Sequence, residues 1–225
     1  MVRKSNKQIT AQVVESRLGG DHIMAAAYTS ELPTFGVKQG LTNYSAAYCV
    51  GLLCARRLLT KIGLDTKYKG NTVVGKFFEN QDDESRRSFR CFLDVGIQRT
   101  TTGANIFGAL KGAVDGGLNI PYSGNRLAAG YFDKKANKYN EAALANRIYG
   151  VHVSDYMKQL AGDEAAYKTQ FGTYIKNGVK PEALKDIYTK AHEAIRKAPV
   201  IKRELPTTNG KKVLTKEQRL AKRAD

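Results

Sequence analysis

The 225-residue chain has no tryptophan, only five prolines, three cysteines and three histidines. The cysteines lie in apolar surroundings and form no C-x-x-C pair, which argues against a disulfide framework or a structural zinc site and favours a reducing compartment. His22, His152 and His192 are too far apart in the sequence to show metal-ligand spacing. We therefore expect neither a metal nor another cofactor.

Long apolar runs are also missing. No window of about 18 apolar residues occurs, so the sequence predicts no membrane span. The first residues, MVRKSNKQIT, lack the apolar run of a signal peptide. The hydrophobic content of 42% is nevertheless enough for a folded core.

Acidic residues are scarce relative to basic ones. The chain has 21 Asp and Glu against 37 Lys and Arg, which gives a formal net charge of +16. Such a field favours polyanionic partners, mainly nucleic acid and less often an anionic membrane surface. The alternative is a basic protein whose charge serves only solubility.

The acidic residues that do occur form no catalytic pattern. A two-metal nuclease site needs clustered carboxylates, but Glu15 and Asp94 stand alone at the ends of two expected strands. No G-x-S-x-G motif occurs. GANIFG (103–108) has phosphate-loop spacing, yet Ala109 and Leu110 follow it in place of Lys and Ser/Thr. The sequence therefore predicts no enzyme and no small-molecule substrate.

The first half of the chain alternates between strand and helix patterns. Residues 8–15 and 22–29 are expected to form a β-hairpin. Residues 43–62 repeat apolar positions at helical spacing, with Thr42 or Asn43 as the cap and Gly63 at the end. The pattern then predicts a loop at 64–87, a buried strand at 89–95 (FRCFLDV) and a glycine-rich helix at 104–116.

From about residue 141 the chain is predicted to be helical. One helix either continues past Gly150 or restarts after it, another begins near Asp163, and a last one has Pro181 at its first position. We divide the chain into an α/β RNA-binding core (1–130), a helical extension (131–197) and a basic tail (198–225). The extension has two apolar stripes, one over 167–175 and the other over 184–195.

The glycine-rich helix raises a question of its own, because each interior glycine costs up to about 1 kcal/mol relative to alanine. On a helical wheel, Ile106, Phe107, Leu110, Ala113 and Val114 share one arc, which we assign to the core. Gly108, Gly112 and Gly116 lie on the other side and keep it flat. Either another helix or an RNA backbone could approach this face. The net charge and the hydroxyls at the helix N-terminus favour RNA.

Three segments carry a resemblance to a known family. They are HIMAAAYTSELPTFGVKQGLTNYSAAYCVGLLCARRLL (22–59), FLDVGIQRTTTGANIFGALKGAVDGGLNIPYS (92–123) and AHEAIRKAPV (191–200). The first two are long ungapped stretches that resemble the eukaryotic large-subunit ribosomal proteins that bind 5S rRNA, and the third is a further similar segment. This family is called large-subunit protein five in eukaryotes and universal protein eighteen across the kingdoms. Eukaryotic members usually carry a basic arm before the first strand, whereas this chain begins almost at that strand.

The resemblance implies a fold, a function and partners. The implied fold is a mixed sheet flanked by helices in a ribonuclease-H-like layout, with a helical C-terminal extension. The implied function is structural: the protein binds 5S rRNA and anchors it in the central protuberance of the large (60S) subunit. The implied partners are 5S rRNA, large-subunit rRNA and neighbouring ribosomal proteins, among them universal large-subunit protein five. The implied location is the cytoplasmic ribosome, after passage through the nucleus and nucleolus.

The residues and the resemblance together select candidate RNA contacts. The strongest group surrounds the start of the glycine-rich helix, where hydroxyls and cations gather. Asn43 and Tyr44 could instead only cap and pack, and Arg56 and Arg57 could instead complement the helix C-terminal dipole. The full set is Lys38, Asn43, Tyr44, Arg56, Arg57, Arg99, Thr100, Thr101, Thr102, Asn105, Gly108, Lys111, Gly112, Tyr122, Arg126, Lys211, Lys212, Arg219, Lys222 and Arg223.

A rival function stays open at this point. The chain could be an assembly or protein-interaction factor that uses its C-terminal helices, with RNA binding that is generic and driven by charge. The two apolar stripes are expected to be helix-packing faces, but they could also dock a neighbouring protein. Survival of RNA binding after loss of residues 141–225 would separate the two functions.

Overall fold

A computed structural model describes residues 1–83, 85–128 and 140–200. Its sheet has three antiparallel strands in the order β1 (Val2–Lys4), β2 (Ile9–Glu15) and β3 (His22–Tyr28). In the β2–β3 register Thr10 faces Tyr28, and a bulge follows Val13. The expected hairpin is therefore confirmed.

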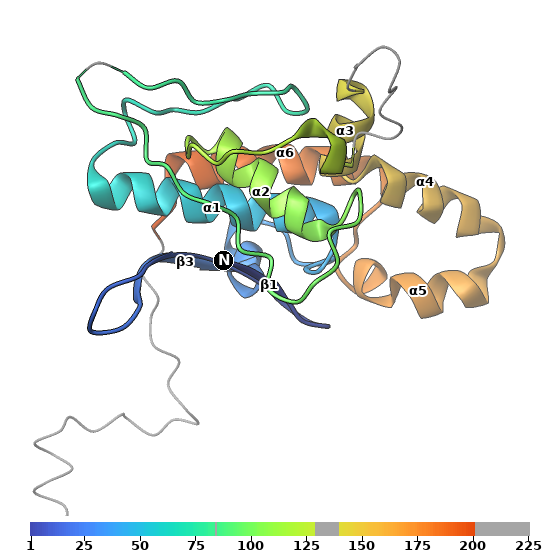
Figure 1. The fold of residues 1–225 in the computed structure, drawn as a ribbon. Helices are drawn as coiled ribbons and strands as arrows, with labels where there is room; N and C mark the ends of the chain where they lie inside the picture. Colours follow the sequence, from blue (N-terminus) through green and yellow to red (C-terminus); the bar gives the residue numbers. More distant parts are fainter. Residues whose placement is uncertain (84, 129–139, 201–225) are drawn as a thin grey trace, which may run out of the picture.

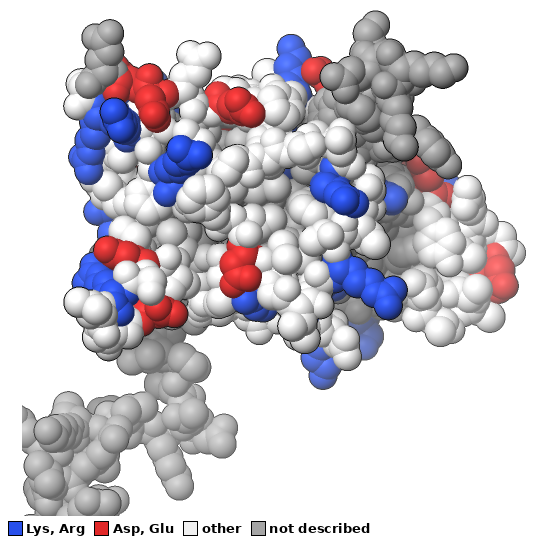
Figure 2. Space-filling model, viewed as in Figure 1, with Lys and Arg blue, Asp and Glu red and all other residues white. Residues whose placement is uncertain are grey.

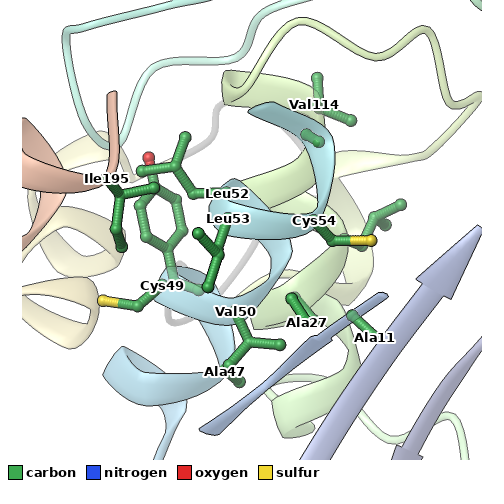
Figure 3. Close-up of a cluster of buried hydrophobic side chains, with 14 of the residues drawn as sticks. Ala11, Ala27, Ala47, Cys49, Val50, Leu52, Leu53, Cys54, Val114 and Ile195 are labelled. Carbon is green, nitrogen blue, oxygen red and sulfur yellow. The ribbon is translucent and has the colours of Figure 1, made fainter. Parts of the chain in front are cut away.

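Helix α1 (Tyr44–Ile62) is the centre of the molecule. Asn43 caps it, since the side chain accepts a hydrogen bond from the amide of Ala46 at 2.7 Å, and Gly63 ends it in the left-handed conformation. The helix lies against the sheet on one side and against α2 (Asn105–Asp115) and α6 (Leu184–Lys197) on others (Figure 1). Figure 3 shows the resulting core, in which Ala11 and Ala27 of the sheet meet α1 side chains, with Val114 of α2 and Ile195 of α6 nearby.

The rest of the described chain consists of short helices. The 3-10 turn η1 follows the sheet and η2 follows α2. The α4–α5 pair leads through η4 to α6. The bounds are η1 Thr29–Phe35, η2 Gly124–Arg126, α3 Glu141–Ile148, α4 Val151–Gln159, η3 Leu160–Gly162, α5 Glu164–Lys176 and η4 Pro181–Ala183. The helix that begins at 141 thus ends before Gly150, and a new one starts after it. Pro181 begins the 3-10 turn that leads into α6.

The buried strand expected at 89–95 does not form. This segment forms a single bridge, Arg90 to Asn119, and its outer face is open, with Phe92 72% exposed. Its backbone partners are split: Cys91 bonds to Asn119, whereas Asp94 accepts from the amide of Val2. Such divided pairing cannot build a ladder with one neighbour.

An apolar cavity of about 610 Å³ lies between the segment, the sheet and the helices.

The described sheet is consequently antiparallel rather than mixed, and the coarse α/β class is what the structure shows. In the described residues no helix is long and apolar enough to cross a membrane, and no group of His, Cys, Asp or Glu could hold a metal ion. The three cysteines are free. Cys49 and Cys54 are buried and Cys91 is half-buried, as small core residues would be.

Candidate nucleic-acid interface

The glycines of α2 pack against α1. A Cβ on Gly112 would lie 2.1 Å from the carbonyl oxygen of Tyr48, and one on Gly116 would lie 2.6 Å from the Ala55 methyl. Gly108 faces Tyr44 in the same way. The expectation that RNA approaches this glycine face is wrong, and the helix alternative is correct. The helical wheel gave the glycines an outer face, but α2 is buried on nearly every side and has no outer face.

This packing makes α1 and α2 parallel and brings their N-termini to one end of the molecule. The pairs Gly108–Tyr44, Gly112–Tyr48 and Gly116–Ala55 advance together along both helices. Asn105, at the start of α2, donates from Nδ2 to the carbonyl of Thr42 at 2.7 Å, just before α1 begins. Ala104 supplies no side-chain cap to α2. Two aligned helix dipoles thus present their positive ends side by side, an arrangement that favours a phosphate.

Two loops carry exposed cations and hydroxyls to this end. Arg126 donates to the carbonyl of Thr100 at 3.1 Å, and its own carbonyl accepts from the amide of Gly103. Thr102 donates to the carbonyl of Asn125. We call this surface the basic end; its exposed residues are Lys38, Arg99, Thr100, Thr101, Thr102 and Arg126. In Figure 2 Lys and Arg side chains gather at this end with no carboxylate between them, whereas at the opposite end both charges are interleaved.

The sequence reasoning missed three cations that border the basic end. Arg147 is exposed, and its carbonyl accepts from Ser45 at 3.1 Å, which places the end of α3 beside the start of α1. Lys4 and Lys7 are exposed, and the carbonyl of Lys4 accepts from Gln98. For Lys4 and Lys7 the only available signal was their place in the basic opening segment, which was examined only for the apolar run of a signal peptide.

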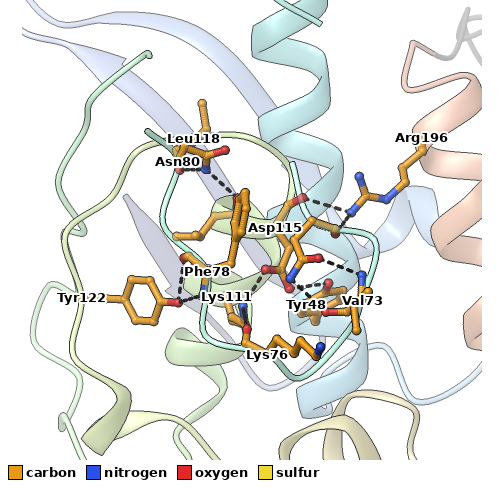
Figure 4. Close-up of polar contacts among 12 residues, drawn as sticks. Tyr48, Val73, Lys76, Phe78, Asn80, Lys111, Asp115, Leu118, Tyr122 and Arg196 are labelled. Carbon is orange, nitrogen blue, oxygen red and sulfur yellow. Dashed lines mark hydrogen bonds and ion pairs between the residues drawn. The ribbon is translucent and has the colours of Figure 1, made fainter. Parts of the chain in front are cut away.

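Lys111 has a structural role in place of the expected RNA contact. Its side chain is fully buried, and the ammonium lies 2.6 Å from Asp115 and donates to the carbonyl of Lys76 at 2.6 Å. Tyr48 donates to the other carboxylate oxygen at 2.8 Å (Figure 4). Burial raises the pKa of Asp115 above its ordinary range, against the opposing effect of Lys111 and Tyr48. The network ties the loop before residue 80 to α1 and α2.

Arg56 and Arg57 are also occupied inside the protein. Arg56 is 8% exposed and donates to the carbonyls of Tyr68 and Asp65. Arg57 forms an ion pair with Glu31 and donates to the carbonyl of Ala26, on the outer edge of β3, at 2.9 Å. Both arginines therefore fasten loops and a strand edge to α1 and do not extend the basic end.

Three of the remaining candidates, Asn43, Tyr44 and Tyr122, are also engaged inside the protein. Asn43 caps α1 and donates to the Tyr188 hydroxyl at 3.0 Å, and Tyr44 is buried, so both follow the capping-and-packing alternative. Tyr122 is half-buried, and its hydroxyl donates to the carbonyl of Phe78 at 3.0 Å. Burial raises the pKa of Tyr122 to about 12. Lys211, Lys212, Arg219, Lys222 and Arg223 lie outside the described residues.

Comparison with known proteins defines the class of this chain. Residues 1–123 match the family model for ribosomal large subunit proteins 60S L5 and 50S L18, and residues 184–224 match the ribosomal L18 C-terminal region. The large ribosomal subunit protein uL18 of Helianthus annuus is 50% identical over 230 residues, covering 99% of this chain and 77% of its own length. Those of Bombyx mori (52% identical; 91% of this chain, 69% of the relative) and Drosophila melanogaster (49%; 99% and 77%) are similar.

These matches define a structural protein of the large ribosomal subunit. The chain belongs to the family of ribosomal large subunit proteins 60S L5 and 50S L18. The resemblance noted in the sequence is thereby confirmed. Membership makes the chain a ribosomal constituent of the cytoplasm rather than an enzyme, in a family for which RNA binding is typical.

Proposed function

We propose that the chain binds 5S rRNA through the basic end and anchors it in the central protuberance of the large subunit. The observation that carries the proposal is the coincidence of two parallel helix N-termini with exposed Lys38, Arg99 and Arg126. Membership in a large-subunit ribosomal family supports the choice of rRNA as the polyanion.

Binding at this end rests on phosphate neutralisation and on fit to RNA shape. The Arg99 and Arg126 guanidiniums can each donate two hydrogen bonds to one phosphate. Thr100, Thr101 and Thr102 add hydroxyls, and the uncapped start of α2 adds backbone amides. Asn105 holds the segment before α1 to the start of α2, and Arg126 holds the loop after α2 to the loop before it, so the phosphate groups would meet a preorganised surface.

The proposal extends to partners, location and organisation. We propose contacts with large-subunit rRNA and with neighbouring proteins of the central protuberance, including universal large-subunit protein five, and passage through the nucleus and nucleolus during assembly. The ribonuclease-H-like layout and the division at residues 130 and 197 belong to the same proposal. Membership in the family supports these points.

A salt titration tests the RNA contact. Affinity for 5S rRNA and for a tRNA of similar length is measured for three chains: wild type, the triple variant Lys38→Gln/Arg99→Gln/Arg126→Gln, and a control triple Lys158→Gln/Lys168→Gln/Lys176→Gln. Each phosphate contact contributes about −0.7 to −0.9 to the slope of log K against log salt. We expect the first triple to flatten the slope by roughly 2 to 3 and to lose the preference for 5S rRNA.

The control triple removes the same formal charge from exposed positions of α4 and α5. We expect it to keep the wild-type slope and the preference. If both triple variants flattened the salt slope and weakened the preference for 5S rRNA equally, only the net charge would matter. The proposal would then give way to generic, charge-driven binding.

A further inference from the structure

The C-terminal end of α3 is fixed beside the start of α1. The hydroxyl of Ser45, in the first turn of α1, donates to the carbonyl of Arg147 at 3.1 Å, and Ser45 itself is fully buried. Leu144 and Ile148, on the inner side of α3, are fully buried in the main core. α3 contacts both α1 and α4 (Figure 1). The backbone of residue 147 therefore has a defined place at the end of the molecule where α1 begins.

The turn after α3 reinforces this position. Gly150 has a φ of 73°, which favours glycine. A Cβ at Gly150 would lie 3.0 Å from the Tyr188 ring and 3.4 Å from the hydroxyl oxygen of Ser45. Asn43, which caps α1, donates to the hydroxyl of the same Tyr188 at 3.0 Å. The corner between α3 and α4 is thus packed on the cap of α1.

The side chain of Arg147 differs from the arginines that fasten loops inside the protein. It is exposed, and its guanidinium has no hydrogen-bond or ion-pair partner among the described residues. Arg56, Arg57 and Arg196, by contrast, all donate to backbone carbonyls. A guanidinium stays charged and carries five N–H donors, so an unpartnered one on a fixed backbone suits a phosphate. The alternative is that Arg147 only complements the negative end of the α3 dipole.

We propose that Arg147 binds a backbone phosphate of the RNA at the basic end, and that Ser45 is the residue that positions it. This inference rests on the proposed function, because it assigns the same polyanion to the same surface. It adds that the RNA site is built from two parts of the chain. Arg99 and Arg126 reach it from the core, whereas Arg147 reaches it from the helical extension, so bound RNA joins the two.

A double-mutant cycle tests the proposal. Affinity for 5S rRNA is measured over a salt series for wild type, Arg147→Gln, Ser45→Ala and the double variant. We expect Arg147→Gln to weaken binding roughly tenfold and to flatten the slope of log K against log salt by about 0.7 to 0.9. Ser45→Ala should weaken binding roughly threefold. It should have no further effect in the Arg147→Gln background, because the buried hydroxyl acts only through residue 147.

Two matched variants serve as controls. Arg87→Gln removes the same charge from an exposed position at the other end of α1, where the carbonyl of the neighbouring Arg86 accepts from Tyr68. Ser154→Ala removes a buried hydroxyl from α4. Both controls should keep the wild-type affinity and slope, and circular dichroism should be the same for all variants.

A wild-type affinity and slope in Arg147→Gln would overturn the proposal and leave Arg147 as a complement to the α3 dipole. Equal weakening by Ser45→Ala with and without Arg147 would overturn the positioning role. The Lys38/Arg99/Arg126 triple variant tests the proposed function separately. If that triple binds like its control while Arg147→Gln still loses affinity, the proposed function fails and Arg147 remains an RNA contact. If only the triple loses affinity, the proposed function stands without Arg147.

Discussion

At the scale of single residues, charge type alone does not decide function in this chain. Lys111, Arg56 and Arg57 carry the same charge as Arg99 and Arg126, yet the first three are fixed to carbonyls and carboxylates inside the protein. A cation that satisfies buried carbonyls is a structural residue, since its removal leaves them unpaired.

Lys111→Met should therefore destabilise the fold and leave RNA affinity unchanged. Breaking a buried ion pair costs about 3–5 kcal/mol, and we expect the lower end because Asp115 keeps its Tyr48 hydrogen bond and has a raised pKa. Urea unfolding measures the loss, with Lys158→Met on the surface of α4 as the control, expected within about 0.5 kcal/mol of wild type. A folded Lys111→Met protein with weakened 5S rRNA binding would restore Lys111 to the RNA site.

His192 should make stability depend on pH. It is buried against Tyr48 and Tyr149, its Nε2 has no partner, and burial, aided by the Arg196 charge, lowers its pKa to about 3. The unfolded chain binds this proton near pH 6.5 and the folded chain does not. Stability should thus fall as pH drops from 6.5 towards 3, by up to about 1.4 kcal/mol per unit.

Urea unfolding at several pH values measures this slope. His192→Phe removes one titrating group and should flatten the dependence of the free energy of unfolding on pH between 6.5 and 4.5. His152, whose pKa is lowered to about 4, still contributes to this dependence in the same direction. An unchanged slope in His192→Phe would show that this histidine titrates freely.

At the scale of elements, glycine sets the distance between α1 and α2. Gly112→Ala places a methyl group 2.1 Å from the Tyr48 carbonyl oxygen, which is backbone and cannot rotate away. The helices must separate, and we expect a loss of about 3 kcal/mol, at the upper end of overpacking costs. Gly172→Ala in α5 is the matched control, because no atom lies within 4 Å of its added Cβ.

The control should gain about 0.5–1 kcal/mol, since alanine is the better helix former. Thermal unfolding of the two variants measures the difference. A Gly112→Ala protein as stable as wild type would mean that the helices do not pack at this distance.

Elements with strong local signals were predicted well. The hairpin and α1, with Gly63 at its end, follow from local chemistry. The sequence did not decide between Thr42 and Asn43 as the cap, or between one helix and two across Gly150. The 89–95 segment was predicted wrongly as a buried strand, because its residue types favour an extended backbone but cannot say whether one neighbour will supply a full ladder. The glycine face was misassigned for a related reason: a wheel shows which residues share a face, and only tertiary packing shows what covers it.

The same limit applies to the candidate site. Arg99 and Thr100–Thr102 are consecutive, and Arg126 joins them through its hydrogen bond to the Thr100 carbonyl. Lys38 belongs to the same end because α1 and α2 run parallel. The glycine-rich helix and the family resemblance together had selected these residues. Arg147 was missed because α3 is far away in sequence and meets the start of α1 through one hydrogen bond to Ser45. Burial of Lys111 was equally invisible, since its i,i+4 partner Asp115 could have been a surface pair.

At the scale of the whole molecule, the positive charge is directional. The basic end concentrates cations around two helix N-termini. The edge carbonyls of β3 at Ala26 and Met24 accept hydrogen bonds from Arg57 and Lys61, and residues 151–180, which contain α4 and α5, carry four lysines against three carboxylates. The basic end is therefore the face best suited to a polyanion.

The most direct test of this account is tethered cleavage of 5S rRNA. An iron chelate is attached to Thr101→Cys at the basic end and, separately, to Thr169→Cys on α5, both in a Cys91→Ser background because Cys49 and Cys54 are buried. The account predicts cleavage of 5S rRNA at one discrete site from position 101 and none from position 169. Equal, scattered cleavage from both positions, or cleavage from 169 alone, would contradict it.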